Sequence, residues 1–225
     1  MIIALAALLA LQAKAPPPVA TTKEAMQKVQ LIVGDWRVTG MPREMKRDAW
    51  TEKSSWGFKI DKEEYSLTLA ATDAVFWKEA TLKFDLKKQV YVLETVLVAG
   101  GGRTYAGTLV EKERLLTLEE TTDAWPRERA VFSLLRDNRF LIDIETQSAK
   151  GKDWTTMAQL GCTKEGVPFV RGEGVKCIVT GGAGSIPVTH AGKTYYVCCS
   201  GCRAFFTENP AKTIEDAKKA GWIKD

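Results

Sequence analysis

The residues of this chain that are best suited to chemistry are its cysteines and its single histidine. Four of the five cysteines and the only histidine fall between Cys177 and Cys202, in a chain of 225 residues. Thiolates and imidazoles are ligands that zinc and copper ions favour in proteins. This window therefore favours metal coordination over other chemistry.

Three kinds of local structure are expected to position these sulfurs. Cys177 precedes a Gly-rich turn, Cys198 ends the second strand of a hairpin whose reversal is at Ala191-Gly192, and Cys202 lies in the first turn of a helix that begins near Ser200. The sulfurs of Cys177, Cys198 and Cys202 can then converge on one point. The free amides at the helix N-terminus also favour thiolates there.

Further spacings in the same segment match a known pattern. They are the turn Cys177-Ile178-Val179-Thr180-Gly181, the strand Gly192 to Tyr196, the Cys-x-x-x-Cys of Cys198 and Cys202, the pair Phe205-Phe206, and Asn209-Pro210. Through these motifs, Gly174 to Lys219 resembles the YHS and TRASH family of small metal-binding domains. The resemblance implies that Cys177, Cys198 and Cys202 are metal ligands. It also implies a role in sensing, trafficking or resistance to heavy metals.

A fourth ligand is open at this point. Some members of that family carry a second cysteine where this chain has Thr180, so the candidates are Cys199, His190, a solvent molecule, or no ligand at all. Three thiolates alone suit Cu(I), whereas four sulfurs, or three sulfurs and an imidazole, suit zinc. The expected cofactor is therefore a zinc or copper ion.

Two other interpretations use the same cysteines. Cys199-Ser200-Gly201-Cys202 has the Cys-x-x-Cys spacing of thiol-disulfide oxidoreductases, but the chain after Cys202 is too short for the strands and helix of a thioredoxin-like fold. Structural disulfides are the second alternative, because an exported protein meets oxidising conditions. Cys162 stands apart and is expected to be a lone buried thiol.

Residues 22–165 show a different pattern. A short helix is expected from Thr21 to Gln30, and ten short segments with strand-like alternation follow it. These begin near Trp36, Trp56, Tyr65, Phe76, Val90, Tyr105, Leu115, Ala130, Phe140 and Trp154. Short turns and no helical pattern between them predict an antiparallel meander that closes into a barrel.

The start of the first strand carries a second resemblance. Gly34-Asp35-Trp36, placed after a short helix, is similar to the Gly-x-Trp opening of lipocalin-like (calycin) barrels. The resemblance implies that Trp36 packs across the closed end of the barrel. Such barrels either hold a small apolar ligand or are filled by side chains, and the many large apolar residues here favour a filled interior.

The N-terminus predicts export. Residues 1–15 read MIIALAALLALQAKA, with an apolar run too short to span a bilayer and an Ala13-Lys14-Ala15 cleavage pattern typical of a signal peptide. Residues 16–21 form a Pro-rich spacer. A periplasmic or extracellular location is expected, and no later segment is long and apolar enough to cross a membrane.

The whole chain is thus expected to be mainly β, with a lipocalin-like barrel at 22–165 and a small α+β, zinc-finger-like metal-binding domain at 174–225. The chain has 32 Lys and Arg against 28 Asp and Glu. These charges are spread along the sequence, so no basic patch that would bind nucleic acid is visible. We expect an exported metal-binding protein that is not an enzyme. The alternatives are a carrier of a small apolar ligand and a thiol-disulfide oxidoreductase.

Overall fold

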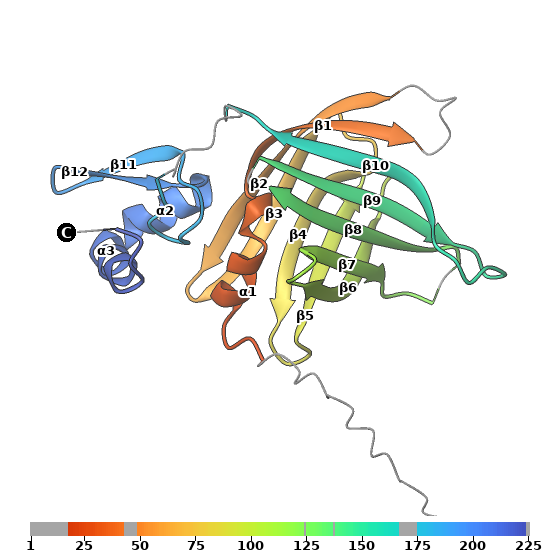
Figure 1. Cartoon of the computed structure of the whole chain (residues 1–225), viewed down its shortest axis with the longest axis horizontal. Helices are drawn as coiled ribbons and strands as arrows, with labels where there is room; N and C mark the ends of the chain where they lie inside the picture. Colours follow the sequence, from red (N-terminus) through yellow and green to blue (C-terminus); the bar gives the residue numbers. More distant parts are fainter. Residues whose placement is uncertain (1–17, 43–48, 124, 137, 167–174, 224–225) are drawn as a thin grey trace, which may run out of the picture.

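The described part of the chain forms a closed antiparallel β-barrel followed by a smaller cysteine-rich unit (Figure 1). The structure is a computed structural model, and it describes residues 18–42, 49–123, 125–136, 138–166 and 175–223. Ten strands close the barrel, with β1 paired to β2 on one side and to β10 on the other. The predicted mainly β fold with an antiparallel barrel is confirmed.

The elements follow in a simple order. The helix α1 (Thr22–Lys28) and a 3-10 turn, η1 (Gln30–Ile32), precede the barrel. The barrel strands are β1 (Gly34–Pro42), β2 (Trp50–Asp61), β3 (Glu64–Thr72), β4 (Trp77–Asp85), β5 (Val90–Leu97), β6 (Gly102–Val110), β7 (Leu115–Glu120), β8 (Arg127–Arg136), β9 (Arg139–Gln147) and β10 (Thr155–Lys164). The C-terminal unit contains β11 (Ile186–His190), β12 (Lys193–Val197), α2 (Ser200–Glu208) and α3 (Pro210–Lys219).

The alternation in sequence sets which face of each strand points inward. In β2, Trp56 and Phe58 are buried and their neighbours Ser55 and Lys59 are exposed, as expected when successive side chains take opposite faces. Sequential hairpins then place each strand beside the next, so every barrel strand has two neighbours. A closed barrel has no free sheet edge.

Trp36 is buried near the start of β1. Its side chain is almost fully buried, its Nε1 donates to the carbonyl of Ile32 at 2.7 Å, and its ring meets Phe140 edge to face with centroids 4.6 Å apart. The ammonium of Lys164 lies 5.4 Å from the Trp36 ring centroid, within the range of a cation–π contact. This indole therefore ties η1 to both β9 and β10.

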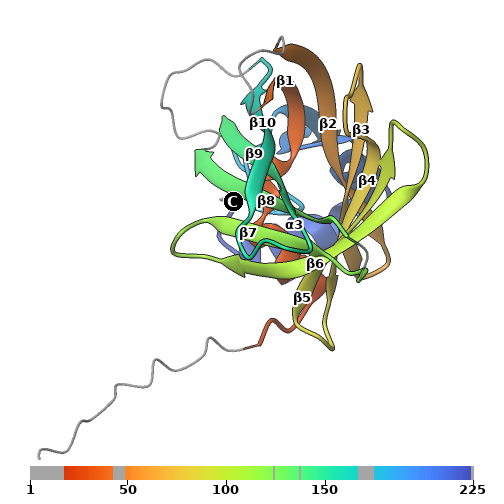
Figure 2. The ribbon, with the colours of Figure 1, turned by 90° about the vertical axis from the view of Figure 1, so that its right-hand side faces the viewer.

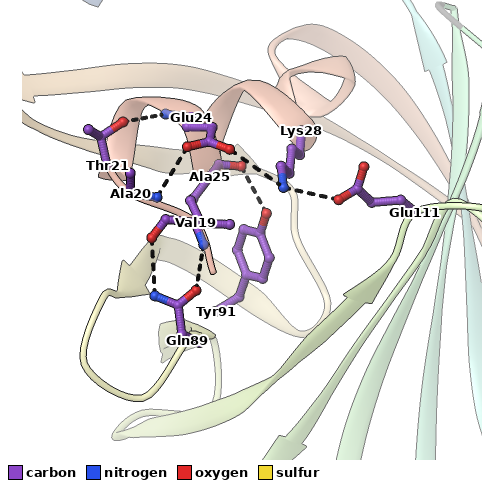
Figure 3. A network of polar contacts seen from close by, with 9 residues as sticks. All are labelled: Val19, Ala20, Thr21, Glu24, Ala25, Lys28, Gln89, Tyr91 and Glu111. Carbon is purple, nitrogen blue, oxygen red and sulfur yellow. Dashed lines mark hydrogen bonds and ion pairs between the residues drawn. The ribbon is translucent and has the colours of Figure 1, made fainter. Parts of the chain in front are cut away.

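The segment before the barrel is anchored by the contacts that Figure 3 shows. Thr21 caps α1 by accepting from the amide of Glu24, and the Tyr91 hydroxyl donates to the carbonyl of Ala25 at 2.8 Å. Further back, Val19 exchanges two hydrogen bonds with the side-chain amide of Gln89. These bonds hold α1 against the strands at the same end of the barrel as Trp36.

The middle of the barrel is filled by side chains. The cavity bounded by Trp56, Trp77, Cys162 and their neighbours has a volume of only about 20 Å³, room for about one water molecule. Burial accounts for most of the rise in the pKa of Cys162, which lies in β10 with 1% of its surface exposed. Cys162 is thus the buried thiol that was predicted.

The end of the barrel away from α1 is hollowed instead. A cleft of about 620 Å³ lies there, bounded mainly by apolar side chains that include Trp50, Phe76, Pro126 and Met157. Met157 leaves about half of its surface exposed to solvent. The barrel therefore combines a filled interior with an open apolar mouth.

The cysteine-rich unit packs against the end of the barrel that α1 covers. Figure 2 looks along the barrel and shows the helices and strands of this unit behind the ring of strands. Phe205 of α2 meets Tyr65 of β3 with ring centroids 6.3 Å apart, and the side-chain amide of Gln27 in α1 donates to the carbonyl of Thr180 at 2.8 Å. Buried residues of the unit join those of the barrel in one continuous cluster.

Several predictions on the ends of the domains fall largely outside the described residues. The signal peptide at 1–15 lies wholly outside them, as do residues 16–17 of the spacer and most of the boundary between 165 and 174. Within the described residues, no helix has the length and apolar character that crossing a membrane requires.

Candidate metal centre

Cys177 is held by a tight turn at the start of the C-terminal unit. Its amide donates to the carbonyl of Gly182 at 2.6 Å, and its carbonyl accepts from the amide of Gly181 at 2.8 Å. Gly181 has a φ of +76°, and a Cβ there would lie 2.5 Å from the Trp222 ring. Only glycine satisfies both conditions, so the turn that aims Cys177 depends on this residue.

The other cysteines surround the junction between β12 and α2. Cys198 directly follows β12, Cys199 is the N-cap of α2 in an extended conformation, and Cys202 lies in the first helical turn. A parallel bridge between Cys177 and Tyr196 of β12 brings the turn to this junction. Three separate local structures thus deliver their sulfurs to one place, as the spacing predicted.

The sulfurs of Cys177, Cys198 and Cys202 all lie within 4.8 Å of one another. The Sγ atoms of Cys198 and Cys202 are 3.5 Å apart. Sulfurs bound to one ion at about 2.3 Å are separated by roughly 4 Å, so these three side chains fit a shared soft ion. All five cysteines are free thiols in the structure.

Hydrogen bonding and burial lower the pKa of two of the four clustered cysteines and raise the pKa of the other two. Hydrogen bonds from Cys198, and then from Cys202, hold the pKa of Cys177 far below the ordinary thiol range, against the opposing effect of burial. Bonds from the same two residues lower the pKa of Cys199. The pKa values of Cys198 and Cys202 are raised, in both cases first by the hydrogen bond to Cys177. These hydrogen bonds thus favour the thiolate form at Cys177 and Cys199, and the thiolate is the form that binds metals.

Cys199 connects this cluster to the barrel. The backbone amide of Phe58 in β2 donates to its Sγ at 3.2 Å, and that Sγ lies 3.9 Å from the sulfur of Cys198. Close by, a Cβ on Gly201 would lie 1.5 Å from the carbonyl oxygen of Phe58. The start of α2 is thus pressed against β2, a contact that the sequence did not indicate.

His190 is placed away from the three sulfurs. It ends β11 and pairs with Lys193 beside the hairpin turn, whereas Cys198 follows the opposite end of β12. At a rise of about 3.3 Å per residue, Lys193 and Cys198 are roughly 16 Å apart. The His190 ring instead meets Phe206 edge to face. Of the two side chains considered as a fourth ligand, Cys199 is the one that lies beside the cluster.

Thr180 also belongs to the surroundings of the site. Its Oγ1 lies 3.8 Å from the sulfur of Cys198, within reach of a weak hydrogen bond. It is almost fully buried. Thr180 thus faces the cluster.

No protein-family model matches the chain, and no curated protein is significantly similar to it in sequence. The resemblance of residues 174–219 to YHS and TRASH domains therefore depends on the cysteine, aromatic and proline spacing.

Replacing Cys199 by serine should show whether Cys199 is itself a metal ligand or only supports the three ligands. Because the Cys199 sulfur accepts the Phe58 amide and lies outside the group of three, we expect Cys199→Ser to retain the metal with a loss of affinity of no more than about tenfold, as for an outer-shell partner. Competition with a chromophoric chelator measures this affinity. A loss as large as that for Cys202→Ser would instead make Cys199 a ligand.

Proposed function

We propose that this protein binds one soft or borderline metal ion, zinc or copper, through the thiolates of Cys177, Cys198 and Cys202. The observation that carries the proposal is the convergence of these three sulfurs, from a turn, a strand end and a helix start, to within 4.8 Å of one another. Without a metal, the buried thiols could bond mainly to one another, and thiols form only weak hydrogen bonds. A bound ion satisfies all three at once.

The donor set decides which metals are suitable. The three converging ligands are all sulfur, and no carboxylate or imidazole of the described residues belongs to the group. Sulfur ligands select Cu(I) and zinc over magnesium, calcium or manganese. Three sulfurs alone favour Cu(I), and recruitment of Cys199 as a fourth would favour zinc.

We further propose a binding role in metal sensing, trafficking or resistance, rather than a catalytic one. The N-terminal apolar run supports export, to the periplasm or the cell exterior. In an oxidising compartment, a bound ion also protects the thiols that hold it, because a coordinated thiolate is not available to form a disulfide.

Metal retention tests this function. The full chain is purified anaerobically under reducing conditions, loaded with Zn(II) or Cu(I), desalted, and analysed for metal and for reactive thiols. We expect close to one equivalent of metal per chain and protection of Cys177, Cys198 and Cys202 from a thiol reagent. If the chain retains far less than one equivalent with Zn(II) and also with Cu(I), the proposal is contradicted.

A carrier role for the barrel is the second candidate, because of the apolar cleft of about 620 Å³ at the open mouth. Its volume is within the range of small-molecule sites. If this cleft takes a ligand, a fluorescent apolar probe should bind the full chain with saturable, one-to-one stoichiometry, and Met157→Glu should weaken that binding by tenfold or more. Absence of saturable binding removes this candidate and leaves the metal site unaffected.

A further inference from the structure

A second hollow lies against the metal centre, where the cysteine-rich unit meets the barrel. It has a volume of about 360 Å³, and its walls come from α1, η1, the ends of barrel strands and the turn after Cys177. Cys198 forms part of its wall. We call this hollow the Cys198 cleft.

Cys198 is the member of the cluster that the cleft exposes. Cys177 and Cys202 have no exposed surface, and Cys199 is also buried, whereas Cys198 is half-buried. A metal that approaches through the cleft must therefore meet the sulfur of Cys198 before the others.

The Cys198 cleft is strongly basic. Four cationic side chains line it, Lys28, Arg114, Lys164 and Lys176, and no acidic side chain of the described residues does. Lys28 is paired with Glu111 at 3.0 Å, and Arg114 donates to the carbonyl of Leu135. Lys176 is exposed and forms no ion pair with the described residues. Among the described residues, no carboxylate therefore neutralises the charges of Arg114 and Lys176.

This charge is unsuited to a free metal cation and suited to an anion. Like charges repel across the opening, so the cleft opposes the approach of a hydrated Zn²⁺ or Cu⁺ ion to Cys198. A metal that arrives bound to a thiol bearing carboxylates carries net negative charge. Arg114 and Lys176 then attract it.

We propose that the Cys198 cleft accepts the metal as a complex with a small anionic thiol and passes it to Cys198 by ligand exchange. The metal–sulfur bond to the donor breaks as the bond to Cys198 forms, the proton of the Cys198 thiol passes to the departing donor thiolate, and the oxidation state of the metal does not change. Cys177 and Cys202 then replace the remaining donor ligands. This inference rests on the proposed metal site and adds the route and the chemistry of the donor.

Two donors of opposite charge test the proposal. Cu(I) is supplied to the reduced full chain either as its mercaptosuccinate complex, which is anionic, or as its cysteamine complex, which is cationic. Transfer is followed by copper analysis of the protein fraction after rapid desalting of timed samples. We expect faster transfer from mercaptosuccinate, and a difference between donors that shrinks as salt is raised. The final amount of bound Cu(I) should be the same with both.

Charge reversal in the cleft should remove this preference. We expect Lys176→Glu combined with Arg114→Glu to slow transfer from mercaptosuccinate by about tenfold, without slowing transfer from cysteamine. Lys53→Glu with Lys78→Glu is the matched control, since it makes the same change in net charge at exposed positions of β2 and β4 outside the cleft. Arg114→Glu alone should slow transfer from mercaptosuccinate by a smaller factor. Unlike Lys176, which precedes Cys177, Arg114 is not next to a cysteine in the sequence.

The outcomes distinguish this proposal from the metal site itself. Equal transfer rates from both donors, or equal slowing by the cleft and control variants, would overturn the cleft proposal while one equivalent of Cu(I) is still retained. If the wild-type chain retains no metal from either donor, the proposed function fails first. A double variant that does not fold is replaced by Lys176→Gln, for which the preference for mercaptosuccinate should fall and the amount of bound metal should not.

Discussion

Replacing Cys177, Cys198 or Cys202 by serine is expected to lower metal affinity by more than about a hundredfold, beyond what the loss of an outer-shell partner causes. A serine hydroxyl is not ionised near neutral pH and is a poor ligand for a soft ion. The two remaining sulfurs come from two local structures and cannot enclose the ion.

The same substitutions should remove the stabilisation that the metal provides. A ligand present at a hundred times its dissociation constant adds about 2.7 kcal/mol to the free energy of unfolding. We therefore expect the midpoint of thermal unfolding to rise with metal in the wild-type chain and to stay unchanged in each variant. Chelator competition and thermal unfolding with and without metal measure both effects.

Cys162→Ser is the control for this series. Cys162 is buried in β10, inside the barrel, and belongs to no group of converging ligand atoms among the described residues. Its replacement can cost stability, because it buries a hydroxyl, but the metal affinity should be unchanged. If all four variants retain metal equally well, the three-cysteine site is wrong.

Replacing Gly201 by alanine is the second change with a large expected effect. The added Cβ would lie 1.5 Å from the carbonyl oxygen of Phe58 and 2.7 Å from its carbon, which are backbone atoms of β2 that cannot rotate away. Either α2 or β2 must shift, and overpacking of this kind costs about 3 kcal/mol or more. We expect the cysteine-rich unit to separate from β2 and the Phe58 amide to lose its bond to Cys199.

Gly57→Ala is the matched control for Gly201→Ala. Gly57 is in β2 beside the same contact, but a Cβ there would meet Cys199 at 3.9 Å, an ordinary van der Waals distance. Hydrogen exchange at the Phe58 amide and the free energy of unfolding compare the two variants. Equal protection and equal stability in both would show that α2 is not held against the barrel as described.

Much of the barrel could be predicted because its determinants are local. Alternation over ten short segments indicated the strands, and the turns between them required antiparallel neighbours. Helix ends were less exact: the helix predicted to end at Gln30 is divided at Val29, where α1 gives way to the turn η1.

The metal centre was predictable in part for the same reason. Cys177, Cys198 and Cys202 are placed by a turn, a hairpin and a helix start, all of which have sequence signals. The contact between Cys199 and Phe58 has none, because its two partners are 141 residues apart and meet through the shape of the barrel. The basic cleft could not be predicted from the sequence either, since Lys28, Arg114 and Lys176 come from three distant segments.

X-ray absorption at the edge of the bound metal tests whether three cysteine sulfurs of this chain share one ion. For the wild-type protein loaded with zinc or Cu(I), we predict a first shell of at least three sulfur atoms, at about 2.3 Å for zinc, and loss of this sulfur shell in Cys202→Ser. A shell made only of oxygen and nitrogen, or one that is identical in Cys202→Ser, would show that the three cysteines do not hold the ion.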